Sequence, residues 1–149
     1  MRRVLAPTLL LVLATSLPCL AAEQQPSDLA KLIARADAAG DEKAELYARV
    51  VEAEVSTAVH QFADGQNDAA FVSVDAVNDY SDKCLGAAQQ RAKKLKQTEI
   101  ALRESARRLH DLEQTLEFEN RPKVKAAVQH VEDVRSKLLQ IMFAPPHRK

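Results

Sequence analysis

Apolar residues recur every three to four positions along most of the chain, a spacing that indicates amphipathic helices rather than strands. The first helix is expected between Ser27, which follows Pro26 and can act as its N-cap, and Ala39. Its apolar face consists of Leu29, Leu32, Ile33 and Ala36. Gly40 is expected to end this helix.

A second helix is expected between Asp41, which can cap its start, and Gly65, which can end it. Its apolar stripe comprises Leu46, Tyr47, Val50, Val51, Val55, Ala58, Val59 and Phe62. The stretch FADGQNDAAF, residues 62–71, then separates it from a third helix that begins at Asn67 or Asp68.

The pattern predicts one long helix, or two nearly collinear helices, because no proline occurs between Asp68 and Glu117. Gly86 is the weak point of this span, since glycine costs about 1 kcal/mol relative to alanine inside a helix. Leucine recurs every seventh residue in the second half of the span, at Leu95, Leu102, Leu109 and Leu116. Thr98 and Ser105 at intervening positions weaken a free-standing zipper, so packing against another helix of the same chain is favoured.

The segment Asn120-Arg121-Pro122 predicts a break and a new helix start. The last helix carries an apolar stripe formed by Val124, Ala127, Val128, Val131, Val134, Leu138, Ile141 and Met142. Pro145-Pro146 end it before a basic tail, residues 145–149. The chain is therefore predicted to be all-α: an antiparallel helical bundle with a long central helix and a C-terminal amphipathic helix.

Residues 1–22 have the pattern of a secretory signal peptide. Met1-Arg2-Arg3 is basic, Val4–Leu20 is mostly apolar with prolines at 7 and 18, and Ala21-Ala22 are small residues suited to cleavage. Retention as a membrane anchor is the alternative, but the apolar run falls short of the ~20 residues that a spanning helix needs. We expect an exported protein, periplasmic or secreted, with one helical domain over residues 23–144.

Cleavage after Ala22 removes Cys19 and leaves Cys84 as the only cysteine, so the mature chain has no internal disulfide. Cys84 is then either buried or available to link a dimer. Its neighbours Tyr80 and Ala88 are typical of a helix face in a core, which favours burial.

Charge is divided unevenly along a chain with 21 basic and 21 acidic residues. Residues 23–82 have net charge −9 and residues 83–149 have net charge +7. Pairing of the two halves within the folded chain is favoured, although head-to-tail association or a basic face toward an anionic surface stays open. Candidate anion contacts are Arg91, Lys93, Lys94, Lys96, Arg107, Arg108, Arg121, Lys123 and Lys125. The export signal, the six aromatic residues and the balanced total charge disfavour nucleic-acid binding.

Catalytic and metal-binding motifs are missing from the sequence. None of its histidines follows glutamate at the Glu-x-x-His spacing of metal-binding bundles, no G-x-S-x-G elbow occurs, and the few glycines form no phosphate loop. A calcium loop starting at Asp64 lacks the glycine and glutamate that such loops require. We therefore predict no cofactor, no metal and no enzymatic activity. A small enzyme would require His110 and His130 to converge with carboxylates.

The stretch EVSTAVHQFADGQNDAAFVSVDAV, within Leu46 to Leu85, resembles a tetratricopeptide-type helical hairpin. Ala58, Gly65 and Ala70 match the small positions of that repeat, whereas Thr57 and Gln61 depart from its large apolar positions. The resemblance implies helix-hairpin packing and a protein-interaction role. The whole arrangement is also similar to small secreted bacterial proteins with a signal peptide, a repeat-like hairpin and a terminal amphipathic helix.

These features favour a non-enzymatic exported helical protein that binds another protein or itself. The candidate partner contacts are Leu95, Leu102, Leu109, Leu116 and Phe143. The alternative is a peripheral binder of anionic cell-envelope material through the basic second half of the chain.

Overall fold

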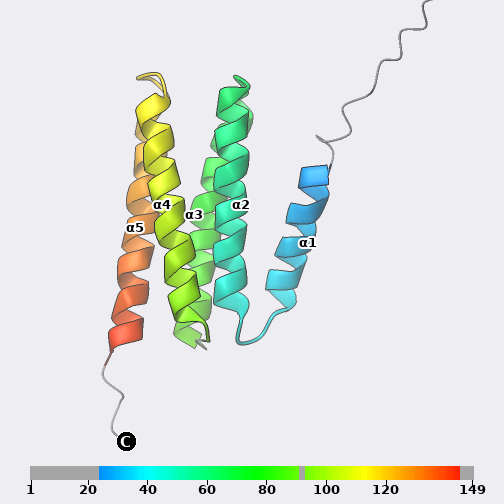
Figure 1. Cartoon of the computed structure of the whole chain (residues 1–149), viewed down its shortest axis with the longest axis vertical. Coiled ribbons are helices and arrows are strands. Elements are labelled where there is room, and N and C mark those ends of the chain that lie inside the picture. The colour runs from blue at the N-terminus through cyan, green and yellow to red at the C-terminus, as the bar shows by residue number, and fades with distance from the viewer. Residues whose placement is uncertain (1–23, 91–92, 145–149) are drawn as a thin grey trace, which may run out of the picture.

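The computed structural model describes residues 24–90 and 93–144, which form a helical bundle. Its helices are α1 (Gln24–Ala38), α2 (Lys43–Ala63), α3 (Asn67–Gln90), α4 (Leu95–Thr115) and α5 (Arg121–Phe143). The all-α prediction is confirmed (Figure 1). The predicted signal peptide and basic tail lie outside the described residues, as does Arg91.

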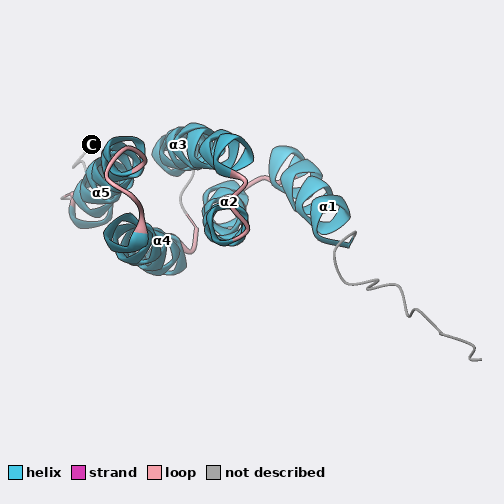
Figure 2. Cartoon of the chain, turned by 90° about the horizontal axis from the view of Figure 1, so that it is seen from above, coloured by secondary structure: helices cyan, strands magenta, loops and turns pink. Residues whose placement is uncertain are grey.

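Helices α2 to α5 form the bundle as two antiparallel hairpins, α2–α3 and α4–α5. The hairpins pack so that α2 lies beside α4 and α3 lies beside α5. Figure 2 shows α3 and α4 across the diagonal from each other. Neighbours within a hairpin are therefore antiparallel, whereas the α2–α4 and α3–α5 pairs run parallel (Figure 1).

Helix α1 lies on the outside of the bundle, against α2. Ala36 is fully buried, but Leu29, Leu32 and Ile33 are only partly covered. A shallow hollow between the two helices, lined by Leu29, Leu32 and Ala53 among others, opens near the start of α1. The first helix is thus an attachment to the bundle rather than part of its centre.

Leucine, valine and alanine side chains fill the core of the bundle. The largest fully buried side chains include Leu102, Leu109 and Leu138. Small residues such as Ala44, Ala48 and Ala127 are also fully buried, which lets neighbouring helix backbones approach closely.

The FADGQNDAAF stretch is a helix end followed by a helix start, as predicted. Gly65 has φ 72°, and the amides of Gly65 and Gln66 bond to the carbonyls of Phe62 and Gln61. This pair of bonds is the Schellman arrangement that satisfies the last carbonyls of a helix. Asp68 lies in the first turn of α3.

Two of the three predicted N-caps are wrong. Ser27 lies inside the first turn of α1, because that helix begins at Gln24. Glu42 rather than Asp41 precedes α2, and Asp41 forms an ion pair with Lys93 instead. The predicted restart at Asn120 is confirmed: Asn120 is the N-cap position of α5 and Pro122 lies in the first turn, although the Asn120 side chain makes no capping hydrogen bond.

The predicted long central helix is also wrong. Helix α3 continues through Gly86 but ends at Gln90, and α4 starts at Leu95 and runs in the opposite direction. Lys94 precedes α4 in the left-handed conformation, φ 60°, which is uncommon for a residue with a side chain. Folding back at this point buries Leu102 and Leu109 inside the chain's own core, and a continuous helix would leave them exposed.

Candidate interaction surface between helices α2 and α4

The leucines predicted as partner contacts lie in the core. Leu102 and Leu109 are fully buried, Leu116 is nearly so, and Leu95 is partly buried against the same core. Their sevenfold spacing therefore serves packing inside the chain, and none of the three buried leucines can reach a partner of the folded protein. Phe143, by contrast, is 79% exposed at the end of α5.

The predicted cations are largely engaged with acidic residues of the same chain. Those in ion pairs within the described residues are Lys93, Lys94, Arg107 and Lys123. Arg121 donates a hydrogen bond to the carbonyl of Leu116 at 2.7 Å. No ion pair within this part of the chain holds Lys96, Arg108 or Lys125.

Ion pairs join the acidic first half of the chain to the basic second half, which confirms the predicted internal pairing. The cross-half ion pairs are Lys93–Asp41, Lys94–Glu42, Lys94–Glu45 and Lys123–Asp75, and His130 forms a hydrogen bond with Asp82. The basic half is therefore partly neutralised by the fold and does not form a single cationic face.

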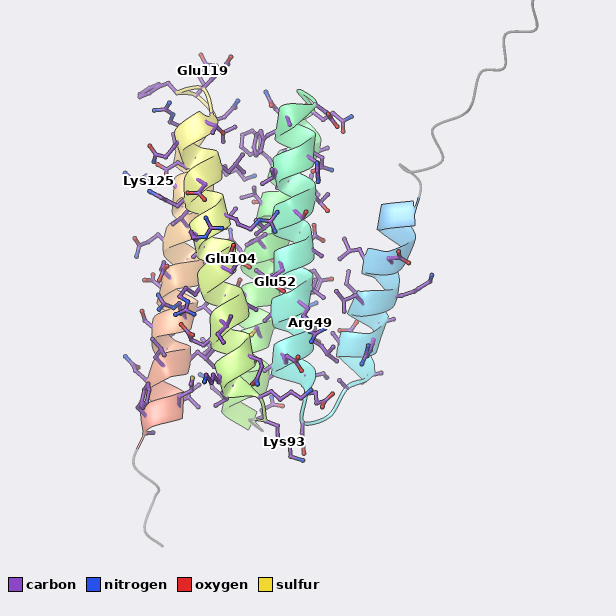
Figure 3. The ribbon with its side chains drawn as sticks, in the orientation of Figure 1. Arg49, Glu52, Lys93, Glu104, Glu119 and Lys125 are labelled. Carbon is purple, nitrogen blue, oxygen red and sulfur yellow. The ribbon has the colours of Figure 1, made fainter. Side chains whose placement is uncertain are left out.

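The seam between α2 and α4 is hollowed at two levels. The lower hollow is lined by Glu45, Arg49, Glu52, Gln97, Ile100 and Ala101. The upper hollow is lined by Val59, Arg107, Arg108, Asp111, Leu112 and Thr115. We call the whole strip the α2–α4 seam. Figure 3 shows Arg49, Glu52 and Glu104 along it.

Ile100 distinguishes this seam from an ordinary charged surface. Its side chain is 44% exposed at the rim of the lower hollow, while Leu112 and Val59 supply an apolar lining to the upper one. Within the leucine heptads of α4, Ile100 falls at an outer position that normally carries a polar residue. An apolar residue at such a position is the sequence signal for this surface, and Ile100 was missed among the predicted contacts.

The charges of the seam are held by neighbours in the same chain. Glu45 accepts a hydrogen bond from Arg49 at 2.8 Å and pairs with Lys94 at 3.1 Å. Arg107 is bound by both Glu104 and Asp111. Arg49 and Arg107 are therefore held in place by acidic side chains of the same chain.

Glu52 lines the lower hollow and Arg108 lines the upper one. Partial burial raises the pKa of Glu52, while the positive charges of Arg49 and Arg108 oppose that rise. The hydrogen bond from Arg107 lowers the pKa of Glu104. Glu104 is therefore firmly ionised at neutral pH, and Arg108 is the cation of the seam without an ion pair among the described residues.

Two of the other seams of the bundle, α3–α5 and α4–α5, are bridged by charged side chains. The ion pairs are Lys123–Asp75 at 2.8 Å across α3–α5 and Arg135–Glu99 at 2.8 Å across α4–α5, and His130 Nε2 also lies 3.0 Å from a carboxylate oxygen of Asp82 across α3–α5. Across α2–α4, the ion pairs among the described residues lie at the base, from Lys94 to Glu42 and Glu45. Above Lys94 this seam stays open along the described part of both helices.

A polar cluster fastens the end of α1 to the bundle. The Tyr47 hydroxyl donates a hydrogen bond to Asp37 at 2.8 Å, and burial together with this bond raises the pKa of Tyr47 to about 12. The Lys83 ammonium lies 4.6 Å from the centre of the Tyr80 ring, which packs beside Tyr47. Each of these side chains contacts another one in the cluster, so the cluster stabilises the attachment of α1 to the bundle.

His110, His130 and Cys84 have partners within the bundle. No group of three or more metal-ligating side chains occurs among the described residues. His110 contacts Glu113 and His130 contacts Asp82, so the two histidines do not share a carboxylate. Cys84 is buried, as favoured; its thiol donates to the Ala44 carbonyl, and burial raises the pKa of the thiol to about 12.

No protein-family model, curated protein or solved structure matches the chain. Across the helices that the structure describes, none is both long enough and apolar enough to cross a bilayer.

Proposed function

We propose that this protein is a non-enzymatic, exported helical protein whose role is to bind another protein or a second copy of itself. The observation that carries the proposal is the α2–α4 seam, which combines two hollows with an exposed isoleucine. Export rests on the signal-peptide pattern of residues 1–22.

The seam has the composition of a protein-binding surface. Apolar side chains, Ile100, Val59 and Leu112, lie within a border of charged residues. Interfaces between proteins commonly have this arrangement of an apolar centre and a polar rim. Phe143 is too isolated at the end of α5 to form such a surface alone, since single exposed apolar residues are common on soluble proteins.

The alternative function, binding of anionic envelope material, has less support. Four of its nine candidate cations already form ion pairs with acidic side chains of the same chain. An anionic polymer would have to compete with these intramolecular partners.

Photo-cross-linking tests the proposed function. A photoreactive amino acid at position 100 should give protein adducts in living cells, identified by mass spectrometry. The matched control is position 72, because Val72 is 69% exposed on α3 and lies away from the seam. Adducts that are equally frequent at both positions, or absent from both, would contradict a binding role for the seam.

A further inference from the structure

The α2–α4 seam has the form of a groove walled by two parallel helices. Its two hollows follow one another along the seam, and residues of both helices line each of them. Ile100 lies at the rim of the lower hollow and Leu112 lines the upper one. The stretch of α4 between these two residues spans about 18 Å at the rise of an α-helix. A single segment that follows the seam would therefore reach both hollows.

The walls of the groove favour a helix as the segment that fills it. An extended segment needs backbone hydrogen-bond partners along its length, whereas the backbone groups within α2 and α4 already bond to one another inside each helix. A helix satisfies its own backbone groups and packs through its side chains alone. Helix α1 packs in this way along the side of α2 that faces away from α4 (Figure 2).

Each hollow also carries one charge that the chain's own ion pairs leave over. Glu52 in the lower hollow and Arg108 in the upper one form no ion pair among the described residues. Their charged neighbours are engaged, since Arg49 is bound by Glu45 and Arg107 is bound by two other carboxylates. A segment along the seam is complementary when it brings a basic side chain to the lower hollow and an acidic one to the upper hollow.

None of the described helices offers such a segment to a second copy of the chain. Their apolar stripes are turned into the core or, for α1, against α2. The large apolar side chains that stay exposed lie on α3, on α4, in the α4–α5 loop and at the end of α5; they are Val72, Ile100, Phe118 and Phe143. No two of them share a helix face, so we expect the segment to come from a different protein.

We propose that the α2–α4 seam binds one amphipathic helix of a different protein, which lies along α2 and α4 and fills both hollows. Its apolar side chains lie about eleven residues apart, a spacing that returns to the same helix face after about three turns. A basic side chain of this helix faces Glu52, and an acidic one faces Arg108. Apolar anchors of a helix in a groove give affinity, and charges set its register. The proposal rests on the proposed function and deepens it by naming the element that the partner contributes.

Photo-cross-linking at two positions, with the labelled partner residues mapped by mass spectrometry, tests the proposal. The full chain carries the photoreactive amino acid at position 100 or at position 115, since Thr115 is an exposed residue of the upper hollow. Both positions should label one segment of one protein at sites about fifteen residues apart, because a helix along the seam has the same rise as α4. An extended segment would be labelled at sites about seven residues apart.

A charge variant tests the upper hollow separately. Arg108→Glu should lower the yield of adducts at position 100 roughly fivefold, because it places a like charge opposite the acidic side chain of the partner. Arg103→Glu makes the same change at an exposed residue of α4 outside both hollows and should leave the yield unchanged. Circular dichroism of both variants should show the helix content of the unmodified protein, since neither side chain belongs to the buried core.

Three results would overturn the single helix: labelled sites about seven residues apart, labels on two different segments, and labels on a second copy of this chain. The proposed function stands in each of these cases, because position 100 is still in contact with a protein. An adduct yield that Arg108→Glu leaves unchanged overturns the charge complementarity. The proposed function itself fails when position 100 labels no protein more often than position 72 does.

Discussion

Several buried polar side chains in this bundle lack the partners that usually accompany them. Glu54 is 8% exposed on α2 and forms no ion pair within the described residues. Burial raises its pKa, and the neighbouring Ser73 hydroxyl opposes the rise only in part. The hydroxyl oxygens of Ser81 and Ser105 are buried without a hydrogen-bond partner in the described chain.

Glu54→Gln should raise the stability of the protein at neutral pH by on the order of 1 kcal/mol, because burial disfavours the charged carboxylate more than the Ser73 hydroxyl favours it. The raised pKa means that the folded state holds the proton more tightly than the unfolded state. The contribution of protonated Glu54 to the free energy of unfolding is complete below the usual glutamate pKa, and it is lost as the pH rises through the raised pKa of the folded state. Thermal melts of both proteins should therefore be recorded from acidic to neutral pH. The difference between their melting temperatures should grow as the pH rises above the usual glutamate pKa. A difference that does not change with pH would show that Glu54 does not cause the effect.

Ser105→Ala should stabilise the bundle by about 1 kcal/mol, because it removes a buried hydroxyl that makes no hydrogen bond. Ser136→Ala on the exposed face of α5 is the matched control for the higher helix propensity of alanine. Chemical denaturation should show a larger gain at position 105 than at 136. An equal gain would mean that the Ser105 hydroxyl carries no penalty.

The helices differ in how firmly they are fixed. Helices α2 to α5 share the core. The extensive contacts of α1 are with α2, and the Tyr47–Asp37 hydrogen bond holds its C-terminal end. The ends of α2 and α4 are set by backbone conformations at Gly65 and Lys94 that have positive φ. The turns and the attachment of α1 therefore depend on a few individual residues.

Tyr47→Phe should loosen α1 without changing the bundle, since it removes only the hydroxyl that binds Asp37. A net loss of about 1 kcal/mol corresponds to roughly fivefold faster amide exchange in α1. Hydrogen exchange read by mass spectrometry should show this change in residues 28–38 and none in α4 and α5. Tyr80→Phe, whose ring packs beside Tyr47, is the control, and equal acceleration by both variants would rule out the hydrogen bond as the anchor.

Gly65→Ala should destabilise the α2–α3 turn by about 1 kcal/mol, because an alanine side chain disfavours the left-handed backbone that Gly65 adopts. A Cβ atom added at Gly65 or at Gly40 would have no other atom within 4 Å, so a steric clash is excluded as the cause at both positions. Gly40→Ala is thus the control and should change stability little. Equal effects in urea denaturation would contradict the conformational explanation.

At the scale of the whole molecule, the opposite charges of the two halves of the chain pair with each other. Its acidic first half and basic second half meet in ion pairs at the base of the bundle and along α3–α5. These contacts are at the surface, so each is weak, but they act together and respond to salt. They also leave the α2–α4 seam as the open strip.

Moderate concentrations of sodium chloride should lower the melting temperature of the protein by a few degrees, because salt screens the cross-half pairs. Lys123→Gln removes one of those pairs and should show a smaller salt dependence. Lys137→Gln, an exposed residue of α5 outside these ion pairs, should retain the full dependence. Melting that is independent of salt would mean that the halves are held together by the core alone.

The all-helical class, the turn at Gly65 and the burial of Cys84 followed from the sequence, because helical periodicity and glycine's conformational freedom act locally. The N-caps were less accurate, since neighbouring residues at each helix start offer equivalent capping and the tertiary contacts decide among them. Asp41 shows this: it binds Lys93 from the start of the next hairpin instead of capping α2. The seam was missed because it combines residues of α2 and α4 that lie far apart in the chain.

The sequence by itself determined where helices form and which of their faces are apolar, since both depend on residues within a few turns of one another. Only the tertiary structure decided that the chain folds back between Gln90 and Leu95, because no proline or glycine marks that reversal. The reversal is favoured by burial of Leu102 and Leu109, which is a property of the assembled core. The same reversal places α4 beside α2, buries the leucines of the heptads and leaves Ile100 on the outer surface.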